Sequence, residues 1–259
     1  MISIACYDGD VQKSQVFKIG PVFETKPTCV LAGFDIYAGL QKNLDVFPLR
    51  SSRFSLLVSL RSTSFGYSTL RTAFAFASNF SDNCLLSVVD LPYRWNALAQ
   101  TEPPSANEIA AEIDKLSSEV WRRIDNVASE FSNLRFDRIK WTDLCAMTPE
   151  WIKIECERAF DKNGPFSKYL KTATRFVFAN RLPVIDPNIA ARFLVEELPV
   201  LCWLYYASPT QYIDLYPGRP FIFFRILENK GFKTELPHLT KMSTGWRRFI
   251  HVDISQKRC

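Results

Sequence analysis

Two short and almost wholly apolar runs, residues 54–59 and 84–90, mark the first predicted strands of this chain. Runs of this length that are rich in Leu and Val are typical of strands buried in a parallel sheet. The intervening residues 70–80 carry apolar side chains at helical spacing. A strand, a helix and a second strand in this order predict a right-handed parallel crossover.

After residue 100 the pattern becomes predominantly helical. A polar break at residues 101–107 contains Ser105, which forms the sequence pattern of a capping box with Glu108. From there, apolar residues recur on one face of a predicted helix that extends to residue 131. Pro149 is expected in the first turn of a further helix. The remaining predicted elements are a strand at 136–141, helices at 166–180 and 187–206, and a final strand at 219–227.

The alternation of strands and helices predicts an α/β protein with a central parallel sheet and a Rossmann-like architecture. With 259 residues, 47% of them hydrophobic, the chain can bury a substantial core without a second domain. We therefore expect a single domain over residues 1–259. Residues 1–50, in which Gly, Pro and Lys separate short apolar pieces, are expected to form an irregular lead-in with one or two strands.

Composition bears on the cellular setting and on the partners. No apolar run approaches the length of a membrane span, and residues 1–10 lack the basic and apolar segments of a secretory signal. The seven cysteines form no C-x-x-C pair, which favours reduced thiols and a cytoplasmic protein. A net charge of +5 permits a polyanionic partner without requiring one.

The chain contains only two histidines, His238 and His251. Because the cysteines are not clustered either, a zinc site is not expected, and the usual base of a Ser-His-Asp triad is nearly absent. The motifs G-x-S-x-G, G-x-G-x-x-G and the P-loop are also missing. These absences argue against a hydrolase nucleophile elbow, a dinucleotide site and an ATP-binding loop.

Ser59 is the strongest candidate for a reactive side chain. It ends the predicted strand 54–59, and open α/β sheets bind their ligands at the carboxyl ends of strands. Glu196 and Glu197 lie within an otherwise apolar predicted helix. A carboxylate in apolar surroundings needs a partner, and it commonly acquires a shifted pKa or binds a cation. The alternative interpretation is that one of the two faces solvent while the other pairs with a nearby Lys or Arg.

Several motifs occur in the order found in the tRNA-dependent cyclodipeptide synthases, which this chain resembles over residues 54–226. The motifs are Ser59 after an apolar strand, Val-Val-Asp at 88–90, a long helix from near 105, Thr148-Pro149-Glu150-Trp151, Asn180-Arg181, Glu197-x-Pro199 and Tyr216-Pro217. The first fifty residues and the tail after about residue 230 do not take part. The resemblance implies a fold like the catalytic domain of class I tyrosyl- and tryptophanyl-tRNA synthetases, without its ATP-binding motifs.

The reaction implied by this resemblance joins the amino acids of two aminoacyl-tRNAs into a 2,5-diketopiperazine. Ser59 would be the covalent nucleophile, which carries an aminoacyl and then a dipeptidyl group. Glu197 would hold the substrate α-amino group and help to move its proton. Tyr216 would act in positioning and in proton transfer during cyclisation. An aminoacyl ester is already activated, so the shortage of histidine is compatible with this chemistry.

The neighbours of these three residues resemble the X-Tyr-Pro branch of the family. Pro217 follows Tyr216, and Ser62 rather than Asn lies three residues after Ser59. The chain departs from the family at Phe193, because a tyrosine is usual four residues before the glutamate. The hydrogen bond expected from that tyrosine near Ser59 is therefore missing or supplied elsewhere. The candidates to replace it are Tyr205, Tyr206 and Tyr212.

Two sets of basic residues are candidates for contact with tRNA, and each has a solvated helix face as its alternative interpretation. One set lies on the long predicted helix and the other on the helix at 166–180. Binding through such a patch should weaken log-linearly with salt. The residues are Lys115, Arg122 and Arg123 in the first set, and Lys168, Lys171 and Arg175 in the second.

The two amino acids joined are not identified by the sequence. An arginine-containing product, known from a divergent fungal group of such synthases, would need an acidic residue in a pocket. Glu196 and Asp214 are the candidates for that residue. For a synthase we expect a monomer with two aminoacyl-tRNAs as substrates, no membrane partner, no metal and no cofactor.

Two other functions stay open. Ser59 with a different base would make a serine hydrolase or acyltransferase, which would turn over simple esters without tRNA. A protein of the same fold that has lost activity would bind tRNA and form no acyl-Ser59 adduct.

Overall fold

The computed structural model describes most of the chain. The described residues are 29–31, 34–38, 53–60, 62, 64–177, 185–210, 212–218, 221–245 and 249–255.

A seven-stranded sheet forms the centre of the fold. Its strands are β1 (Cys29–Leu31), β2 (Phe34–Ala38), β3 (Arg53–Ser59), β4 (Asn83–Val89), β5 (Arg135–Arg138), β6 (Tyr212–Tyr216) and β7 (Ile250–Asp253). They lie in the order β1-β2-β7-β6-β3-β4-β5. The five strands from β7 to β5 are parallel, whereas β2 runs antiparallel to β7 and β1 antiparallel to β2. The predicted α/β class with a central parallel sheet is confirmed.

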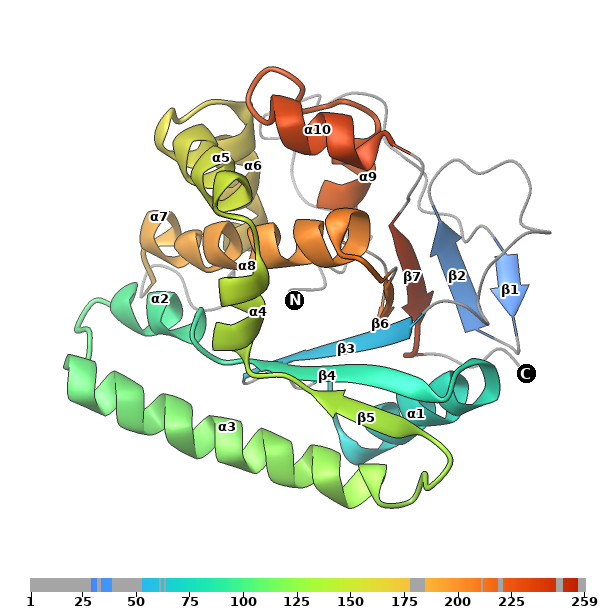
Figure 1. Cartoon of the computed structure of the whole chain (residues 1–259). Coiled ribbons are helices and arrows are strands. Elements are labelled where there is room, and N and C mark those ends of the chain that lie inside the picture. The colour runs from blue at the N-terminus through green and yellow to red at the C-terminus, as the bar shows by residue number, and fades with distance from the viewer. Residues whose placement is uncertain are drawn as a thin grey trace, which may run out of the picture.

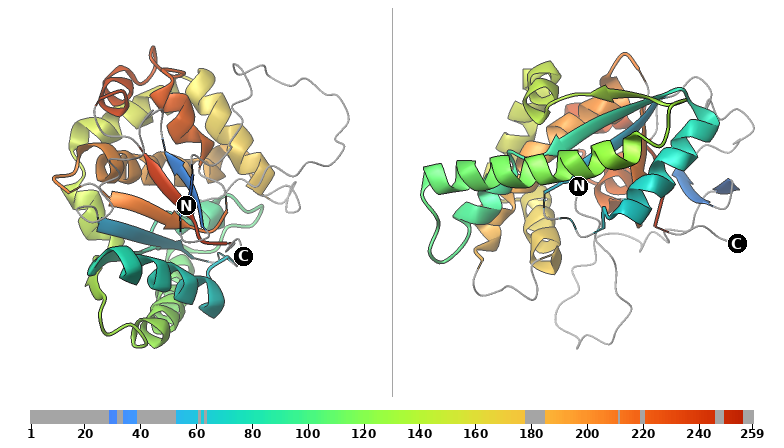
Figure 2. Two further views of the ribbon diagram at one scale, coloured as in Figure 1. Left: turned by 90° about the vertical axis from the view of Figure 1, so that its right-hand side faces the viewer. Right: turned by 90° about the horizontal axis from the view of Figure 1, so that it is seen from below.

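Helices cover both faces of the sheet (Figures 1 and 2). They are α1 (Tyr67–Phe80), α2 (Tyr93–Leu98), α3 (Ala106–Ala128), α4 (Trp141–Met147), α5 (Glu150–Asp161), α6 (Pro165–Val177), α7 (Pro187–Ala190), α8 (Arg192–Cys202), the π-helical turn η2 (Trp203–Ala207), α9 (Ile222–Glu228) and α10 (Pro237–Ser243). Helices α1 and α3 lie against one face, and α4 and α8 lie on the other with the helices around them. The strands β3, β4, β6 and β7 are accordingly buried along almost their whole length, as continuous apolar strands predict, whereas the edge strand β5 is exposed or half-buried.

The alternation of side chains along β3 decides which face carries the candidate site. Phe54 points toward α1, where it meets Phe76 edge-on with 5.6 Å between ring centroids. Ser55 and Ser59 point to the opposite face, because successive side chains of a strand alternate. On that face the hydroxyl of Ser55 lies 3.5 Å from the hydroxyl of Tyr205 in η2. Ser59 therefore projects from the face that α8 and η2 cover.

The first predicted elements are confirmed with small shifts at their ends. β3 and β4 correspond to the two apolar runs, and α1 begins three residues earlier than expected. The predicted capping box is confirmed, since Ser105 accepts the N–H of Glu108 and the Glu108 carboxylate accepts the N–H of Ser105 at 2.8 Å. The strand expected at 136–141 is shorter than predicted, because Trp141 already begins α4.

The strand predicted at 219–227 is wrong. Residues 222–228 form the helix α9, in which Phe223, Phe224, Ile226 and Leu227 are buried. A short, continuously apolar run fits a buried strand and a buried helix equally well, so its periodicity could not decide between them. Residues 219 and 220 lie outside the described part of the chain.

Three further helix predictions need correction at their boundaries. The helix expected at 187–206 is divided into α7, α8 and η2, with Pro199 inside α8. Pro149 is the N-cap of α5 and not a residue of its first turn. The long helix ends at Ala128 and not at 131. The last three residues expected in the helix at 166–180 lie outside the described residues.

Two strands of the sheet were not predicted at all. β6 carries Tyr216 at its carboxyl end, and β7 is added beside it from the segment after residue 230. The lead-in does contain two strands, β1 and β2, within the number expected. Both ends of the chain thus contribute to the sheet that frames the candidate site.

Candidate active site

Ser59 and Tyr216 are the last residues of two neighbouring parallel strands, β3 and β6. The register pairs Ser55 with Asp214, so Ser59 and Tyr216, each an even number of residues farther on, project from the same face. Ser59 is 7% exposed and Tyr216 is 3% exposed. Two of the three proposed catalytic residues are therefore brought to one edge of the sheet, where open α/β sheets bind ligands.

The turn after Ser59 packs directly against Tyr216. Ser62 donates its backbone N–H to the carbonyl oxygen of Ser59 at 3.3 Å, which begins the turn. Phe65 then meets the Tyr216 ring edge-on, with 4.9 Å between ring centroids. Arg123 of α3 donates to the backbone carbonyl of Phe65 at 2.9 Å. This carbonyl contact holds the turn in place, so Arg123 has a structural role that sequence reasoning missed.

Glu197, the third proposed catalytic residue, projects from α8 and is only 1% exposed. Phe193 lies one helical turn earlier, on the same side of α8, and is also buried. The negative charge of Glu197 contributes to raising the pKa of Tyr205. Because α8 lies over the face of the sheet from which Ser59 projects (Figure 1), the buried Glu197 belongs to the same layer as Ser59. The α8 carboxylate and Ser59 thus share one face of the fold.

Of the three tyrosines considered as replacements at Phe193, Tyr205 belongs to this face of the sheet. Its hydroxyl donates to Asp214 Oδ1 at 2.8 Å. Burial, and next the charge of Asp214, holds the pKa of Tyr205 well above its ordinary value of 10. The hydroxyl of Tyr206 instead donates to Glu228 at 3.1 Å. Tyr212 lies at the opposite, amino end of β6.

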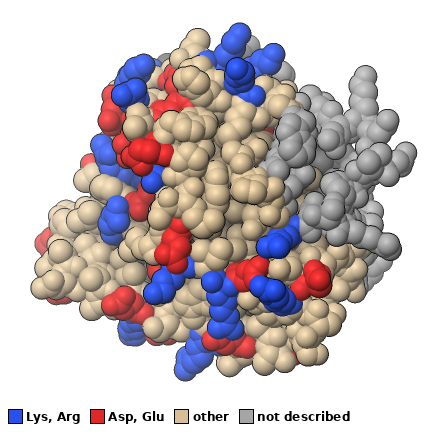
Figure 3. Space-filling model, viewed as in Figure 1, with Lys and Arg blue, Asp and Glu red and all other residues tan. Residues whose placement is uncertain are grey.

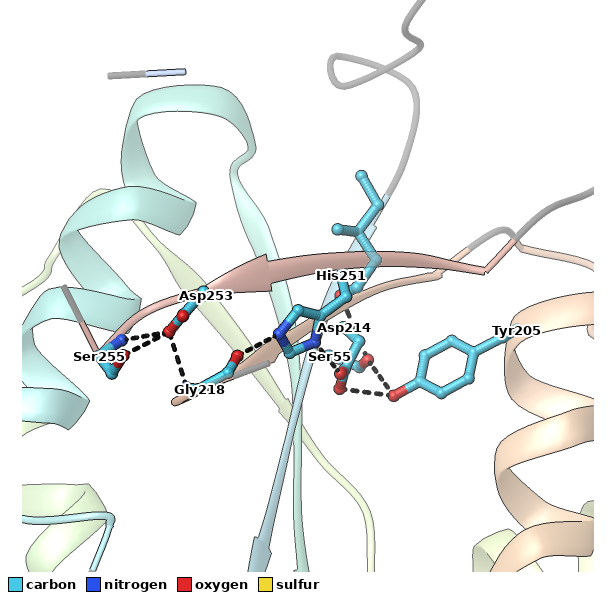
Figure 4. Close-up of polar contacts among 8 residues, drawn as sticks. Ser55, Tyr205, Asp214, Gly218, His251, Asp253 and Ser255 are labelled. Carbon is cyan, nitrogen blue, oxygen red and sulfur yellow. Dashed lines mark hydrogen bonds and ion pairs between the residues drawn. The ribbon is translucent and has the colours of Figure 1, made fainter. Parts of the chain in front are cut away.

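Asp214 forms the centre of a buried polar cluster (Figure 4). Its Oδ1 accepts the Tyr205 hydroxyl, and its Oδ2 lies 2.7 Å from Nδ1 of His251 in β7. Asp214 is fully buried and His251 is 1% exposed. Both carboxylate oxygens are thus engaged within the protein. This arrangement makes Asp214 unsuitable as the carboxylate of an arginine-binding pocket.

The residues after Tyr216 form a turn that β7 holds. Pro217 is buried, and Gly218 has a φ of 94°, in the left-handed region that favours glycine. Gly218 donates its N–H to Asp253 Oδ1 at 2.7 Å, and its carbonyl oxygen lies 2.7 Å from His251 Nε2. Sequence reasoning missed both β7 residues, because β7 itself was not predicted.

No family model and no curated protein matches the sequence at a significant level. Solved structures do match. A cyclodipeptide synthase from Staphylococcus haemolyticus superposes with a TM-score of 0.64 at 14% identity, over 85% of this chain and 99% of that one. One from Bacillus thermoamylovorans gives a TM-score of 0.63 at 13% identity, over 85% and 96% of the two chains.

This chain has the fold of the cyclodipeptide synthases. A further match, a Mycobacterium tuberculosis protein, has a TM-score of 0.52 at 13% identity over 75% of this chain and 85% of that one. Its structure is reported to demonstrate that cyclodipeptide synthetases are related to type I tRNA synthetases. The Rossmann-like architecture expected from the sequence, with its relation to class I synthetases, agrees with this fold.

Within this cyclodipeptide synthase fold, Glu196 and Glu197 project from different sides of α8. It lines a cavity of about 260 Å³ together with residues of α2, α4 and α5. The Glu196 carboxylate accepts a hydrogen bond from the Trp95 indole at 2.7 Å and pairs with Arg94 at 2.9 Å. The alternative interpretation of the two glutamates is thus half right. Glu196 does pair with an arginine, but Glu197 is buried and not solvent-facing.

The same cavity contains a cysteine that is a poor nucleophile. Burial, and next the charge of Glu196, raises the pKa of Cys145 to about 11. Its thiol is therefore protonated at neutral pH, and a thiol is far less nucleophilic than a thiolate. Among the described residues, Cys84, Cys145, Cys156 and Cys202 are free thiols. Ser59 remains the better candidate nucleophile.

Asp90 is a second carboxylate at the edge of the sheet that carries Ser59. It follows Val89, which is paired with Ser59 in the register of β3 and β4. Burial raises the pKa of Asp90, although the hydrogen bond from the N–H of Leu91, 2.7 Å away, opposes the shift. The Val-Val-Asp motif pointed to this position without assigning Asp90 a role.

The two sets of basic residues differ in how they are used. Lys115, Arg122, Lys168 and Arg175 are exposed. Arg123 binds the Phe65 carbonyl, and Lys171 binds the Asn163 side chain at 2.8 Å. On the face shown in Figure 3, Lys and Arg are interspersed with Asp and Glu and do not gather into one patch. Asn180 and Arg181 lie outside the described residues.

None of the described helices is both long and apolar enough to cross a membrane. Within the same residues, no group of three or more His, Cys, Asp or Glu side chains is placed to hold a metal ion.

Proposed function

We propose that this protein is a cyclodipeptide synthase that makes a 2,5-diketopiperazine from two aminoacyl-tRNAs. The observation that carries the proposal is the placement of Ser59 and Tyr216 at the ends of adjacent parallel strands, under the helix that bears Glu197. The fold shared with solved cyclodipeptide synthases supports it. An enzyme of this kind needs a nucleophile, an amine-binding carboxylate and a proton carrier, and these three side chains supply them.

The first step of the proposed reaction is a transesterification. Ser59 Oγ attacks the carbonyl carbon of the first aminoacyl-tRNA, the bond to the ribose oxygen breaks, and the tRNA leaves with the serine proton. The α-amine of the aminoacyl-Ser59 then attacks the ester of the second aminoacyl-tRNA and displaces its tRNA. The product is a dipeptidyl ester on Ser59. Because each ester arrives activated, no strong base is required.

Ring closure completes the proposed cycle. The free amine of the dipeptidyl group attacks the carbonyl carbon of the Ser59 ester, the bond to Oγ breaks, and Ser59 regains its proton. Glu197 binds the ammonium group and takes a proton from it before attack. Tyr216, which meets the turn after Ser59 through Phe65, orients this last step and passes a proton to the leaving oxygen.

The direct test is mass analysis of the protein and its products with charged tRNA. Ser59→Ala should form neither an acyl-enzyme nor a diketopiperazine, whereas Ser87→Ala, which changes a buried serine on β4, should do both. Tyr216→Phe keeps the ring against Phe65 and should slow product release about 10²- to 10⁴-fold, the usual range for lost acid–base catalysis. Tyr206→Phe is its matched control. Diketopiperazine formation by Ser59→Ala would refute the covalent mechanism.

The same experiment separates the two other functions. A serine hydrolase or acyltransferase would react with a fluorophosphonate probe at Ser59 and turn over simple esters without tRNA. A protein that only binds tRNA would show saturable binding and no acyl-Ser59 adduct.

For the substrates, we propose arginine as one of the two amino acids, with Glu196 and not Asp214 as its anchor. Glu196 differs from Asp214 in lining a cavity, and its pairing with Arg94 at 2.9 Å is the kind of contact that a substrate guanidinium would make. The substrate would take the place of Arg94 at Glu196. Glu196→Gln should then abolish arginine-containing product and leave other products intact. Unchanged arginine incorporation would remove Glu196 from this role.

The remaining expectations belong to the same proposal. Ser62 and Pro217 place the protein in the X-Tyr-Pro-like branch, and Phe193 marks its divergence from the family pattern. The proposal is for a monomer, which sedimentation can test. It requires a cytoplasmic location, because aminoacyl-tRNAs are present there.

A further inference from the structure

His251 is one of only two histidines in the chain, and it is buried beside β6. Its two ring nitrogens face two different acceptors. Nδ1 lies 2.7 Å from a carboxylate oxygen of Asp214, and Nε2 lies 2.7 Å from the backbone carbonyl oxygen of Gly218 (Figure 4). Both distances are short for hydrogen bonds of nitrogen to oxygen. The ring therefore bridges a buried carboxylate and the turn after Tyr216.

The partners determine which nitrogen carries hydrogen. A carbonyl oxygen can only accept, so Nε2 of His251 must be the donor toward Gly218. A further proton lies between Nδ1 and the Asp214 carboxylate. Neither nitrogen has a lone pair directed at Ser59. His251 is therefore not the general base that the sequence lacks, although it lies in the strand next to Tyr216.

Gly218 is held at both of its polar backbone groups by β7. Its N–H donates to Asp253 Oδ1 at 2.7 Å, and its carbonyl oxygen accepts from His251. Asp253 is itself fixed, because Ser255 donates both its N–H and its hydroxyl to the same oxygen, at 2.9 Å and 2.6 Å. The φ of 94° at Gly218 is far from the conformation of the strand before it, and glycine can adopt it because it has no Cβ.

We propose that His251 is a positioning residue for Tyr216. By holding the carbonyl of Gly218, two residues away, it fixes the turn that directs the Tyr216 ring toward Phe65 and the end of β3. This inference rests on the proposed function, in which Tyr216 acts during ring closure. Misplacement of a reacting group by about 1 Å can reduce a rate about 10²-fold, so loss of the Gly218 contact should be seen mainly in that step.

Two substitutions separate the two contacts of His251. The amide nitrogen of glutamine lies as many bonds from Cβ as Nε2 does, so His251→Gln keeps a donor for Gly218 and loses the one for Asp214. The amide nitrogen of asparagine corresponds to Nδ1, so His251→Asn keeps the donor for Asp214 and loses the one for Gly218. Each variant is thus the matched control for the other.

His251→Asn should be the less active of the two variants, and His251→Gln should be the less stable one. His251→Asn should acylate Ser59 at nearly the normal rate, accumulate dipeptidyl-Ser59 and release diketopiperazine about 10- to 100-fold more slowly. His251→Gln should release product within about threefold of the wild-type rate, yet melt at a lower temperature than His251→Asn, because Oδ2 of the buried Asp214 carboxylate loses its donor and only the Tyr205 bond to Oδ1 is left. A purely structural role predicts instead that activity falls in the same order as stability.

Crystal structures of both variants give a readout that does not depend on turnover. Tyr216 should move in His251→Asn and keep its place in His251→Gln. If Tyr216 occupies the same position in both, or if both release product at the wild-type rate, the inference is wrong. A wild-type protein that makes no diketopiperazine would instead refute the proposed function, and the position of Tyr216 in the two variants would still decide whether His251 holds it.

Discussion

At the scale of single residues, the buried hydroxyl of Tyr205 is a fixed donor and not a proton carrier. Its pKa is held well above 10 by burial and by Asp214, to which it donates at 2.8 Å. A phenol with so high a pKa does not ionise near neutral pH, so the Tyr205 oxygen keeps its proton and donates it in the hydrogen bond to Asp214. This leaves Tyr216 as the tyrosine available for proton transfer in the proposed reaction.

Tyr205→Phe should lower the free energy of unfolding by about 1–3 kcal/mol, because it removes a donor from the buried Asp214 carboxylate. Urea denaturation measures this change. The exposed Tyr67 provides a control, since Tyr67→Phe should stay within about 0.5 kcal/mol of the wild type. Equal effects of the two substitutions would show that the Tyr205 bond contributes nothing to stability.

Asp90 provides a pH-dependent test at the same scale. Because burial raises its pKa, the folded protein binds a proton here at a pH where the unfolded chain has lost it. The contribution of Asp90 to folding therefore becomes less favourable as pH rises through the unfolded and then the folded pKa.

Asp90→Asn, which keeps an oxygen to accept the N–H of Leu91, should gain stability relative to the wild type as pH rises from about 4 to about 7. Unfolding curves of both proteins across this range measure the difference. A constant difference, or one that falls with pH, would contradict the assigned direction of the shift.

At the scale of elements, the helices above the sheet are joined by buried carboxylates. Glu155 of α5 is 9% exposed and accepts the backbone N–H groups of His238 at 2.8 Å and Leu239 at 3.0 Å. Both N–H groups belong to the first turn of α10, where a backbone N–H has no acceptor within its own helix. The sequence could not predict this connection, since Glu155 looks like any helix-surface glutamate and its partners lie 83 and 84 residues away.

Glu155→Ala should cost about 2–4 kcal/mol of stability, because it leaves two N–H groups at the start of α10 without an acceptor. Glu155→Gln should cost less, since its amide oxygen still accepts one of them. Glu150→Ala, which removes only an exposed pair with Lys153 at 3.2 Å, should change stability by less than about 0.5 kcal/mol. Thermal denaturation monitored by circular dichroism would show this order, and an equal effect at Glu150 would overturn it.

At the scale of the whole molecule, local patterns predicted the centre of the fold and failed at its C-terminal side. β3, α1, β4 and α3 were predicted because each has a clear period and, for α3, a capping box. β6 and β7 have five and four residues, too few for a period to emerge, and their partners are distant in sequence. For the candidate site, the sequence suggested Ser59, Glu197 and Tyr216, of which Ser59 and Tyr216 end adjacent parallel strands. The support for Tyr216 from His251 and Asp253 depends on β7 and could not be predicted.

The placement of charge over the whole molecule leads to a prediction for tRNA. The helices α3 and α6, which carry the two sets of exposed cations, lie on opposite sides of the sheet (Figure 1). We therefore expect the phosphates of one tRNA to contact one set and not the other. Arg123 is excluded from the comparison, because it binds the Phe65 carbonyl. Each lost contact with a phosphate should reduce the slope of log binding constant against log salt by about 0.7–0.9.

We therefore expect Lys115→Ala combined with Arg122→Ala to reduce the salt slope by up to about 1.8 if α3 contacts tRNA. Lys168→Ala combined with Arg175→Ala should leave the slope unchanged in that case, and the reverse should hold if α6 makes the contact. Lys233→Ala combined with Lys241→Ala removes the same charge from exposed positions near α10, so it controls for net charge. Filter binding of a non-hydrolysable aminoacyl-tRNA at several salt concentrations measures all four proteins. Equal slopes in all of them would show that neither helix face binds the phosphates, and that both sets of residues are solvated surface.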